Sequence, residues 1–377
     1  MARPLHVMIA GGGVAALETV LALRDLAEER VNVEVLAPDE DFVYRAMSVA
    51  EPFAQGEARR FPLARLVDLA GGRLTTGTLT RVDAPAQTCW TADGEELTWD
   101  VLVVALGART REGVPGSLTF RGPADTATTQ ALVDDASAGR IQSLTFAVPT
   151  LVAWPLPLYE LALMTKVHLE DFGATNVEIR LVTPEDEPLG VFGREVSAEI
   201  KDLLATRGIE LRTHTTPVVF RSGALVVVPG RAVRTDRVVS LPIPEGRWIP
   251  GLPTDGHGFI RTDSHGRAEG HDRIYAAGDI TSFPLKQGGI AAQQADAVAA
   301  SIAALAGAPV AREPFRPELR GLLLTGLSPR YLSAKLLDAR SEVDTEPLWW
   351  PPAKVFGRYL APFLAEHAGL SQSVPAR

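Results

Sequence analysis

The sequence predicts an α/β protein with two parallel sheets, each built from strand–helix–strand units. The first observation is an apolar run at Leu5–Ala10, followed by helical spacing over Ala15–Leu26 and a second apolar run at Val31–Leu36. The second observation is that the same order returns between residues 144 and 182. Strands joined through a helix run parallel, because the crossover returns the chain to the same end of the sheet. A length of 377 residues also favours more than one core.

A polar, hairpin-containing region follows the first unit. The expected strands there cover Leu74–Val82, Thr88–Thr91 and Leu97–Trp99. Val101–Leu106 is an uninterrupted apolar run, which is typical of a strand buried on both faces of a parallel sheet, and it ends at Gly107.

The second half of the chain repeats the alternation of strand and helix. Its expected elements are the strand Leu144–Val148, the helix Leu158–Phe172, the strand Val177–Val182, the helix Arg194–Arg207 and the short strand Glu210–Arg212. A Gly- and Pro-rich return then leads to the strand Arg273–Ala276 and the long helix Gly289–Leu305.

Composition excludes several classes of protein. The single cysteine, Cys89, rules out an internal disulfide, a Cys-rich zinc site, an iron–sulfur cluster held by this chain alone and a CxxC redox pair. We interpret Cys89 as a small buried hydrophobe. The net charge of −9 argues against a nucleic-acid partner. The spacing of His257, His265 and His271 fits no metal-binding pattern, so no metal is expected.

The sequence shows no targeting or membrane-spanning segment. Glycines interrupt the apolar N-terminal stretch, and the Ala-rich run Ala291–Ala308 contains Gln293, Gln294 and Asp296. We therefore expect a cytoplasmic protein without integral membrane insertion.

The first chemical signal is the segment Gly11-Gly12-Gly13-Val14-Ala15-Ala16, between a predicted strand and a predicted helix. Gly11 permits a tight turn, Gly13 lets the backbone approach a pyrophosphate, and Ala16 allows close helix–strand packing. The helix start offers unpaired N–H groups to the phosphates. The pattern predicts a Rossmann-like dinucleotide site, and the alternative is a Gly-rich turn without a ligand.

An acidic partner for the ribose is missing at the end of the second strand. The expected position, about 20 residues on, is occupied by Ala37. Either Asp39 or Glu40 reaches back, or another group holds the ribose; a solvated turn is the alternative reading of both acids.

The second chemical signal is Gly278-Asp279, at the end of the strand that contains Ile274. Together with the glycine loop and Ala105-Leu106-Gly107, it resembles the FAD-binding domain of the pyridine-nucleotide–disulfide oxidoreductase superfamily. The resemblance spans roughly residues 5–305 and implies FAD as cofactor. It implies that Asp279 binds the ribityl and phosphate region of the flavin. Leu106 departs from the hydroxyl residue of the family's Ala-Thr-Gly element.

The same resemblance implies a domain organisation. A discontinuous FAD domain would cover residues 1–110 and 235–310, and a second Rossmann-like domain would be inserted at 111–234. Residues 311–377 would form a C-terminal cap.

The resemblance also assigns Lys286, Gly289 and Arg45 to the cofactor site. The segment Lys286–Gly289 precedes the long helix, whose N-terminus would face the flavin, so Lys286 is the candidate for electrostatic tuning. The alternative for Lys286 is an exposed loop lysine. Arg45 would lie near the pyrophosphate, with a surface arginine as its alternative.

The pattern breaks in the second domain. Where a second glycine loop belongs, the sequence reads Pro149-Thr150-Leu151-Val152-Ala153-Trp154-Pro155-Leu156-Pro157. Prolines remove N–H donors and Trp154 blocks the approach of a pyrophosphate. This favours a branch resembling sulfide:quinone oxidoreductases and flavocytochrome-c-like flavoproteins, but without their catalytic cysteines.

We therefore expect an FAD-dependent oxidoreductase without redox-active cysteines, passing electrons between a small substrate and a quinone-like or other acceptor. The alternatives are an NAD(P)H dehydrogenase with unusual nicotinamide binding and a non-catalytic flavin-binding or regulatory protein. The tail around Trp349-Trp350 is expected to cover the flavin, form a homodimer contact or dock on a membrane.

Overall fold

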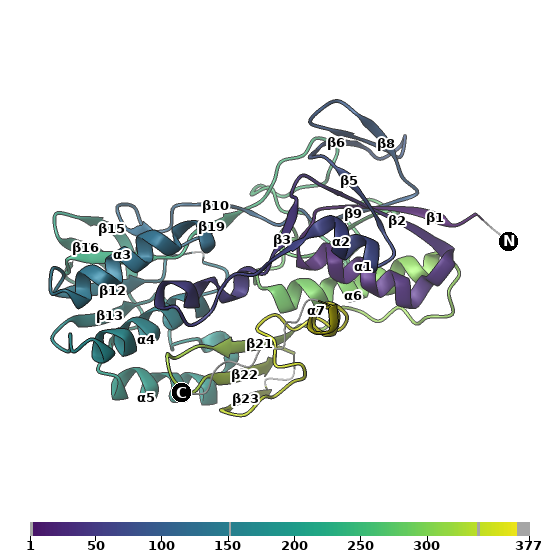
Figure 1. Cartoon of the computed structure of the whole chain (residues 1–377). Helices are drawn as coiled ribbons and strands as arrows, with labels where there is room; N and C mark the ends of the chain where they lie inside the picture. Colours follow the sequence, from purple (N-terminus) through teal and green to yellow (C-terminus); the bar gives the residue numbers. More distant parts are fainter. Residues whose placement is uncertain (1–2, 151, 338–339, 368–377) are drawn as a thin grey trace.

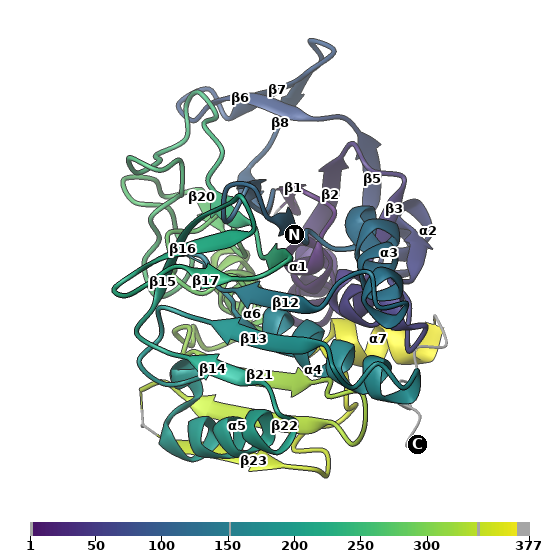
Figure 2. The same ribbon diagram turned by 90° about the vertical axis from the view of Figure 1, so that its left-hand side faces the viewer.

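The computed structural model describes residues 3–150, 152–337 and 340–367, and it shows two α/β lobes side by side (Figure 1). Two short antiparallel strands, β10 (Arg109–Arg111) and β19 (Ile243–Glu245), pair in the connection between the lobes. The C-terminal strands and helix lie against both lobes (Figures 1 and 2). The predicted α/β class is confirmed.

The first lobe is built on a five-stranded parallel sheet in the order β20-β9-β1-β2-β5. Its strands are β1 (Leu5–Ala10), β2 (Val31–Ala37), β5 (Arg73–Thr76), β9 (Val101–Val104) and β20 (Ile274–Ala276). The helices α1 (Val14–Ala27) and α6 (Gly288–Leu305) pack together on one face (Figure 1). The antiparallel strands β6 (Leu79–Asp83), β7 (Thr88–Thr91) and β8 (Glu96–Thr98) contribute to the core on the other face.

Both faces of this sheet are apolar, as expected for parallel strands covered on two sides. Val7 and Ile9 of β1 pack in the core with α1 and α6, whereas Met8 and Ala10 pack in the core with the β6–β8 sheet. Cys89 of β7 is fully buried in this second core, and burial together with the charge of Glu34 raises its pKa to about 11. A thiol in this state is inert, which agrees with a structural role.

The second lobe is built on another five-stranded parallel sheet, in the order β11-β18-β12-β13-β14. Its strands are β11 (Leu118–Thr119), β12 (Ser143–Ala147), β13 (Glu178–Val182), β14 (Glu210–Arg212) and β18 (Arg237–Ser240). The main core cluster of this lobe combines residues of α3 (Thr126–Ser137), α4 (Leu156–Asp171) and α5 (Arg194–Thr206). A separate core contains residues of β15 (Thr216–Arg221), β16 (Ala224–Val228) and β17 (Val233–Arg234), which form an antiparallel sheet.

Some boundaries differ from the sequence prediction. Leu74–Val82 is not one strand but parts of two, because Gly77 turns the chain between β5 and β6. The boundary at 234–235 is also shifted, since β18 pairs with β11 and β12 and so belongs to the second sheet. Unpredicted elements include α2 (Leu63–Leu69), α3, the β15–β17 sheet and the short pair β3 (Asp41–Val43) and β4 (Arg60–Pro62).

The 3-10 helix η2 (Arg45–Phe53) belongs to the first lobe in sequence but packs on the second. Val49, Ala50 and Phe53 lie in the core cluster of α3 and α4. The remaining short helices are η1 (Glu28–Arg30), η3 (Pro123–Asp125) and η4 (Gly190–Phe192).

The C-terminal cap consists of an antiparallel sheet and a short helix. The strands are β21 (Glu318–Leu323), β22 (Arg330–Lys335) and β23 (Arg340–Asp344), and the helix is α7 (Leu360–His367). β21 and β22 join the core of the second lobe, while Leu360 and Leu364 of α7 join the α1–α6 core of the first. Among the described residues, no helix is both long and apolar enough to span a bilayer, and no cluster of three metal-ligating side chains occurs.

Candidate functional site

The glycine loop lies between β1 and α1, in contact with the loop that follows β9. Gly11 has a φ of +128°, and a Cβ added to it would lie 2.2 Å from the carbonyl oxygen of Ala105. The two backbones therefore touch, which only glycine permits at this position. Gly107 also has a positive φ, of +63°, in the loop after β9.

Gly13 leaves open space at the start of α1. A Cβ at this position would meet no heavy atom within 4 Å. No side chain caps α1, and its first turn contains no acidic residue. The first N–H groups of the helix are thus available to an anion, and the helix dipole favours negative charge there. Val14 is half-buried, and Ala15 and Ala16 are buried below the loop.

Gly278 and Asp279 follow β20 and lie next to the glycine loop. A Cβ on Gly278 would lie 3.1 Å from the Cβ of Ala15, and its N–H donates to Oε1 of Gln294 in α6 (2.7 Å). Burial raises the pKa of Asp279, and the charge of Lys286 opposes this. Among the described residues, none donates a hydrogen bond to the Asp279 carboxylate. A carboxylate in this state suits a ligand that brings hydroxyl donors.

Lys286 is anchored beside Asp279. Its Nζ donates to the carbonyl oxygens of Thr281 and of Phe283 (2.7 Å to Phe283) and lies 4.1 Å from the centre of the Phe259 ring. Burial lowers the pKa of Lys286 to about 8, against the opposing charges of Asp279 and Asp255. The half-buried ammonium is therefore held in place by backbone carbonyl groups, unlike an exposed loop lysine.

The N-terminus of α6 is covered by the cap. Gln287 is the N-cap, and its Oε1 accepts from the N–H of Ile290 (2.9 Å). A Cβ on Gly288 would lie 2.8 Å from a methyl group of Val355, and one on Gly289 would lie 3.4 Å from the carbonyl oxygen of Phe356. The C-terminal segment thus lies on the helix end that was expected to face the flavin.

The two tryptophans of the tail lie in different environments. Trp349 is buried: its Nε1 donates to the carbonyl oxygen of Ala353 (2.9 Å), and its ring lies edge-on to Tyr331. Trp350 is 82% exposed.

Two other predicted positions lie apart from these contacts. Arg45 is exposed at the start of η2 and, among the described residues, makes no hydrogen bond or ion pair. Ala37 is buried at the end of β2, and Asp39 and Glu40 are exposed beyond it.

The loop of the second fold is filled by its own side chains. Pro155 is the N-cap of α4 and Pro157 occupies its first turn, so two N–H donors are absent. The Trp154 ring packs 5.7 Å from the Phe192 ring, centre to centre, and Ala153 is buried. Leu151, part of the same predicted loop, lies outside the described residues.

The second fold has an acidic residue just after its second strand, but hydrogen bonds from other side chains already engage its carboxylate. Glu185 follows β13, and its Oε2 accepts from the hydroxyl groups of Tyr159 (2.6 Å) and Thr183 (2.8 Å). Tyr159 is fully buried, and burial raises the pKa of both Tyr159 and Glu185. The acid at the position from which a ribose would be bound is therefore already hydrogen-bonded within the protein.

Sequence reasoning missed two buried glutamates that bind the C-terminal segment. Glu18 accepts from the N–H groups of Tyr359 (2.8 Å) and Leu360 (2.7 Å), and Glu160 accepts from Nζ of Lys354 (2.6 and 2.8 Å). Each glutamate lies among mainly apolar residues in the first half of its helix, and this is the signal that would have revealed them.

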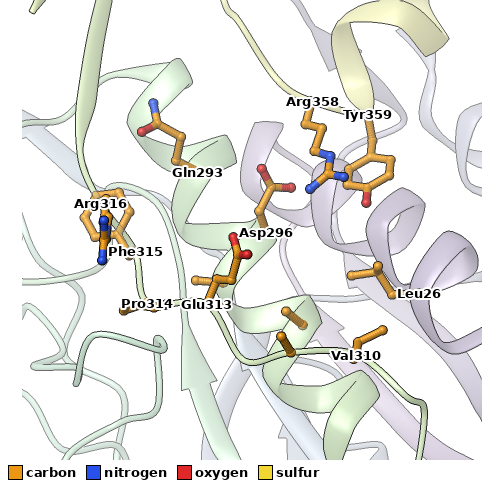
Figure 3. A pocket seen from close by; sticks show the side chains of 13 residues that line it. Leu26, Gln293, Asp296, Val310, Glu313, Pro314, Phe315, Arg316, Arg358 and Tyr359 are labelled. Atoms are coloured by element: carbon orange, nitrogen blue, oxygen red, sulfur yellow. The ribbon is translucent and has the colours of Figure 1, made fainter. Parts of the chain in front are cut away.

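Glu18 also shares a buried environment with Asp296 of α6. Burial and the neighbouring Glu18 raise the pKa of Asp296 to about 8, and burial raises the pKa of Glu18. Figure 3 shows Asp296, Arg358 and Tyr359 around a hollow of about 440 Å³ between α6 and the C-terminal segment. None of the predicted cofactor-binding residues lines this hollow.

The two parallel sheets and these contacts are those of a protein built from two dinucleotide-type folds. Residues 160–300 match the family model described as pyridine nucleotide-disulphide oxidoreductase, a match that begins just after the proline-filled loop. Over that part of its length the chain is similar to this family of oxidoreductases.

The chain is also similar in sequence to curated proteins and in fold to a solved structure. The chain is 28% identical to the ferredoxin reductase component of chlorobenzene dioxygenase from Cupriavidus sp. (strain PS12), over 79% of this chain and 74% of the relative. It is 25% identical to an NADH dehydrogenase-like protein of Mycobacterium tuberculosis, over 74% and 73%. The fold matches the sulfide:quinone oxidoreductase of Aquifex aeolicus with a TM-score of 0.80 and 18% identity, over 90% of this chain and 87% of that one.

Proposed function

We propose that the chain binds FAD non-covalently in its first lobe and works as an oxidoreductase without catalytic cysteines. The observation that carries this proposal is the meeting of three loops at the carboxyl ends of β1, β9 and β20. They bring together the open start of α1 at Gly13, the Ala105–Gly107 loop and the Asp279 carboxylate beside Lys286. A dinucleotide is expected where strand order reverses at such an edge.

Each of these groups has a distinct task toward the cofactor. The N–H groups at the start of α1 would bind the diphosphate, and Gly11 and Gly107 keep the backbone close to it. Asp279 would accept from ribityl hydroxyl groups. Lys286 would place positive charge near the flavin and stabilise its reduced, anionic form. The flavin supplies the electron transfer itself, and the protein sets its position and potential.

Two observations support a donor other than NAD(P)H bound in the usual mode. The loop before α4 is filled by Trp154 and prolines, and Glu185 is occupied by Tyr159. A cysteine route is also unsupported, because Cys89 is the single cysteine of the chain and its thiol is fully buried. We propose a small-molecule donor, with a quinone-like or other acceptor.

The purified full-length protein tests the first part. We expect a flavin absorbance spectrum, or its appearance after reconstitution with FAD. Asp279→Asn should weaken FAD binding about tenfold or more, because hydrogen bonds to a charged group contribute about 1.5–3 kcal/mol. Asp272→Asn is the control, since Asp272 is exposed and 3.6 Å from Arg267. A wild-type protein that binds no FAD would refute the proposal.

A second candidate function is an NAD(P)H dehydrogenase with unusual nicotinamide binding, and the M. tuberculosis relative favours it. Anaerobic mixing of the flavoprotein with millimolar NADH or NADPH separates the two. We expect no bleaching of the flavin band, with dithionite as the positive control. Rapid bleaching by either nucleotide would establish the second candidate instead.

A further inference from the structure

Arg247 lies on the segment that returns from the second lobe to the first. It follows β19, is half-buried, and its Nε donates to the carbonyl oxygen of Gly107 (3.4 Å). Its environment also includes Asp39 and Arg109: burial and the positive charge of Arg109 lower the pKa of Arg247, and the carboxylate of Asp39 raises it. Arg247 is therefore within electrostatic range of residues that follow both β9 and β2.

The strand order of the first sheet shows where these neighbours of Arg247 lie relative to the glycine loop. β9 and β2 flank β1 on its two sides, so the loops after β9 and β2 flank the glycine loop after β1. Arg247 contacts Gly107 on one side of the glycine loop and feels the charge of Asp39, which follows the strand on the other side. These two neighbours place Arg247 near the edge at which Gly11 and Gly13 open.

The positive charges of Arg247 and Arg109 are not neutralised by ion pairs among the described residues. Within the described ranges, neither Arg247 nor Arg109 forms an ion pair, and Asp39 is the one acid that acts on Arg247. Arg111, in the same β10–β19 connection, differs because its Nε lies 3.0 Å from Glu245. Two guanidinium groups without an ion-pair partner among the described residues therefore lie near the loop after β9, on the sheet edge where the start of α1 also favours an anion.

Resting on the proposed function, we propose that Arg247, with added positive charge from Arg109, binds the diphosphate of FAD. The protein would then retain FAD through positive charge on the segment between the lobes. The acid that would hold the ribose is absent, because its position is occupied by Ala37. A planar guanidinium suits this role, because it donates several hydrogen bonds to phosphate oxygens at once.

Binding of FAD, ADP and riboflavin to the flavin-free protein tests the proposal. ADP contains the diphosphate without the flavin, and riboflavin contains the flavin without phosphate. We expect Arg247→Gln to weaken FAD and ADP by about tenfold to a hundredfold each and to leave riboflavin within about twofold. Arg247→Lys should recover part of the loss, and Arg111→Gln, the matched control, should bind all three ligands like the wild type.

The outcomes are distinguishable. Wild-type affinity of Arg247→Gln for ADP, or an equal loss of riboflavin affinity, would overturn the role of Arg247. If Arg247→Gln does not fold, Arg247→Lys gives the answer: it must weaken ADP more than riboflavin. Failure of the wild type to bind FAD or ADP at all would instead refute the proposed function.

Discussion

The helices α1 and α4 open the two dinucleotide folds, and they bury a glutamate at the same place. Glu18 is the fifth residue of α1 and Glu160 the fifth residue of α4, and both are fully buried. Both also bind the C-terminal segment. The loops before the two helices differ: the one at Gly13 is open, and the one at Trp154 is filled. The two folds thus share their attachment to the cap and differ in the capacity to accept a phosphate.

The two attachments also differ in charge. Glu160 faces an opposite charge, Lys354, whereas Glu18 has a like-charged neighbour, Asp296, and two backbone N–H donors. The attachment of α4 is therefore a buried ion pair, and that of α1 is a carboxyl pair that holds a proton.

The largest effect on stability is expected in the open glycine loop before α1. Gly11→Ala would place a methyl group 2.2 Å from the Ala105 carbonyl oxygen at a φ of +128°. We expect a destabilisation of more than about 3 kcal/mol, and loss of FAD binding. Gly13→Ala is the matched variant: its methyl group meets no atom within 4 Å, so the thermal midpoint should stay near that of wild type while FAD affinity falls. Equal melting of the two variants would contradict this account of the loop.

The ion pair of the second fold comes next. Lys354→Met leaves the Glu160 carboxylate buried without its counter-charge, at a cost of about 3 kcal/mol in the free energy of unfolding. Lys201→Met is the control, because Lys201 is exposed and 4.0 Å from Glu187. Denaturant unfolding measures both variants, and a Lys354→Met variant as stable as the control would show that the pair does not hold the cap.

A smaller effect is expected at the filled nucleotide position. Tyr159→Phe removes one of the hydrogen bonds to Glu185 and should cost about 1–2 kcal/mol, without changing FAD affinity. The same denaturant titration and a flavin-binding assay check the two parts. A gain of NADH binding in this variant would mean that Tyr159 alone closes the second site.

The last prediction concerns how the free energy of unfolding changes with pH. Because Asp296 and Glu18 have raised pKa values in the folded state, that state retains protons that the unfolded chain releases. Stability from this pair is present below about pH 4 and is lost as the pH rises toward about 8. Asp296→Asn should therefore resemble wild type near pH 4 and become relatively more stable by pH 8. Parallel pH profiles of the two proteins would exclude a proton on this pair.

The sequence predicted those parts of the fold that depend on local pattern. The strands β1 and β12 and the helices α1 and α6 follow from apolar runs and a glycine loop, and they were placed within a few residues. The boundary at 234–235 and the β15–β17 sheet were not predictable, since they depend on which distant strands pair. The site divides in the same way. Gly11, Gly13 and Asp279 belong to short motifs, whereas Arg247, Glu185 and the two buried glutamates gain their roles from tertiary neighbours.

The seven residues Lys354–Leu360 touch both lobes: Lys354 binds Glu160, the Val355 N–H donates to the Tyr44 hydroxyl (2.8 Å), and Leu360 binds Glu18. Ribosomes make these residues after both lobes. The buried contacts of Glu18 and Glu160 with this segment can therefore form only after both dinucleotide folds have been synthesised. The last part of the chain to be made thus completes the burial of a glutamate in each fold.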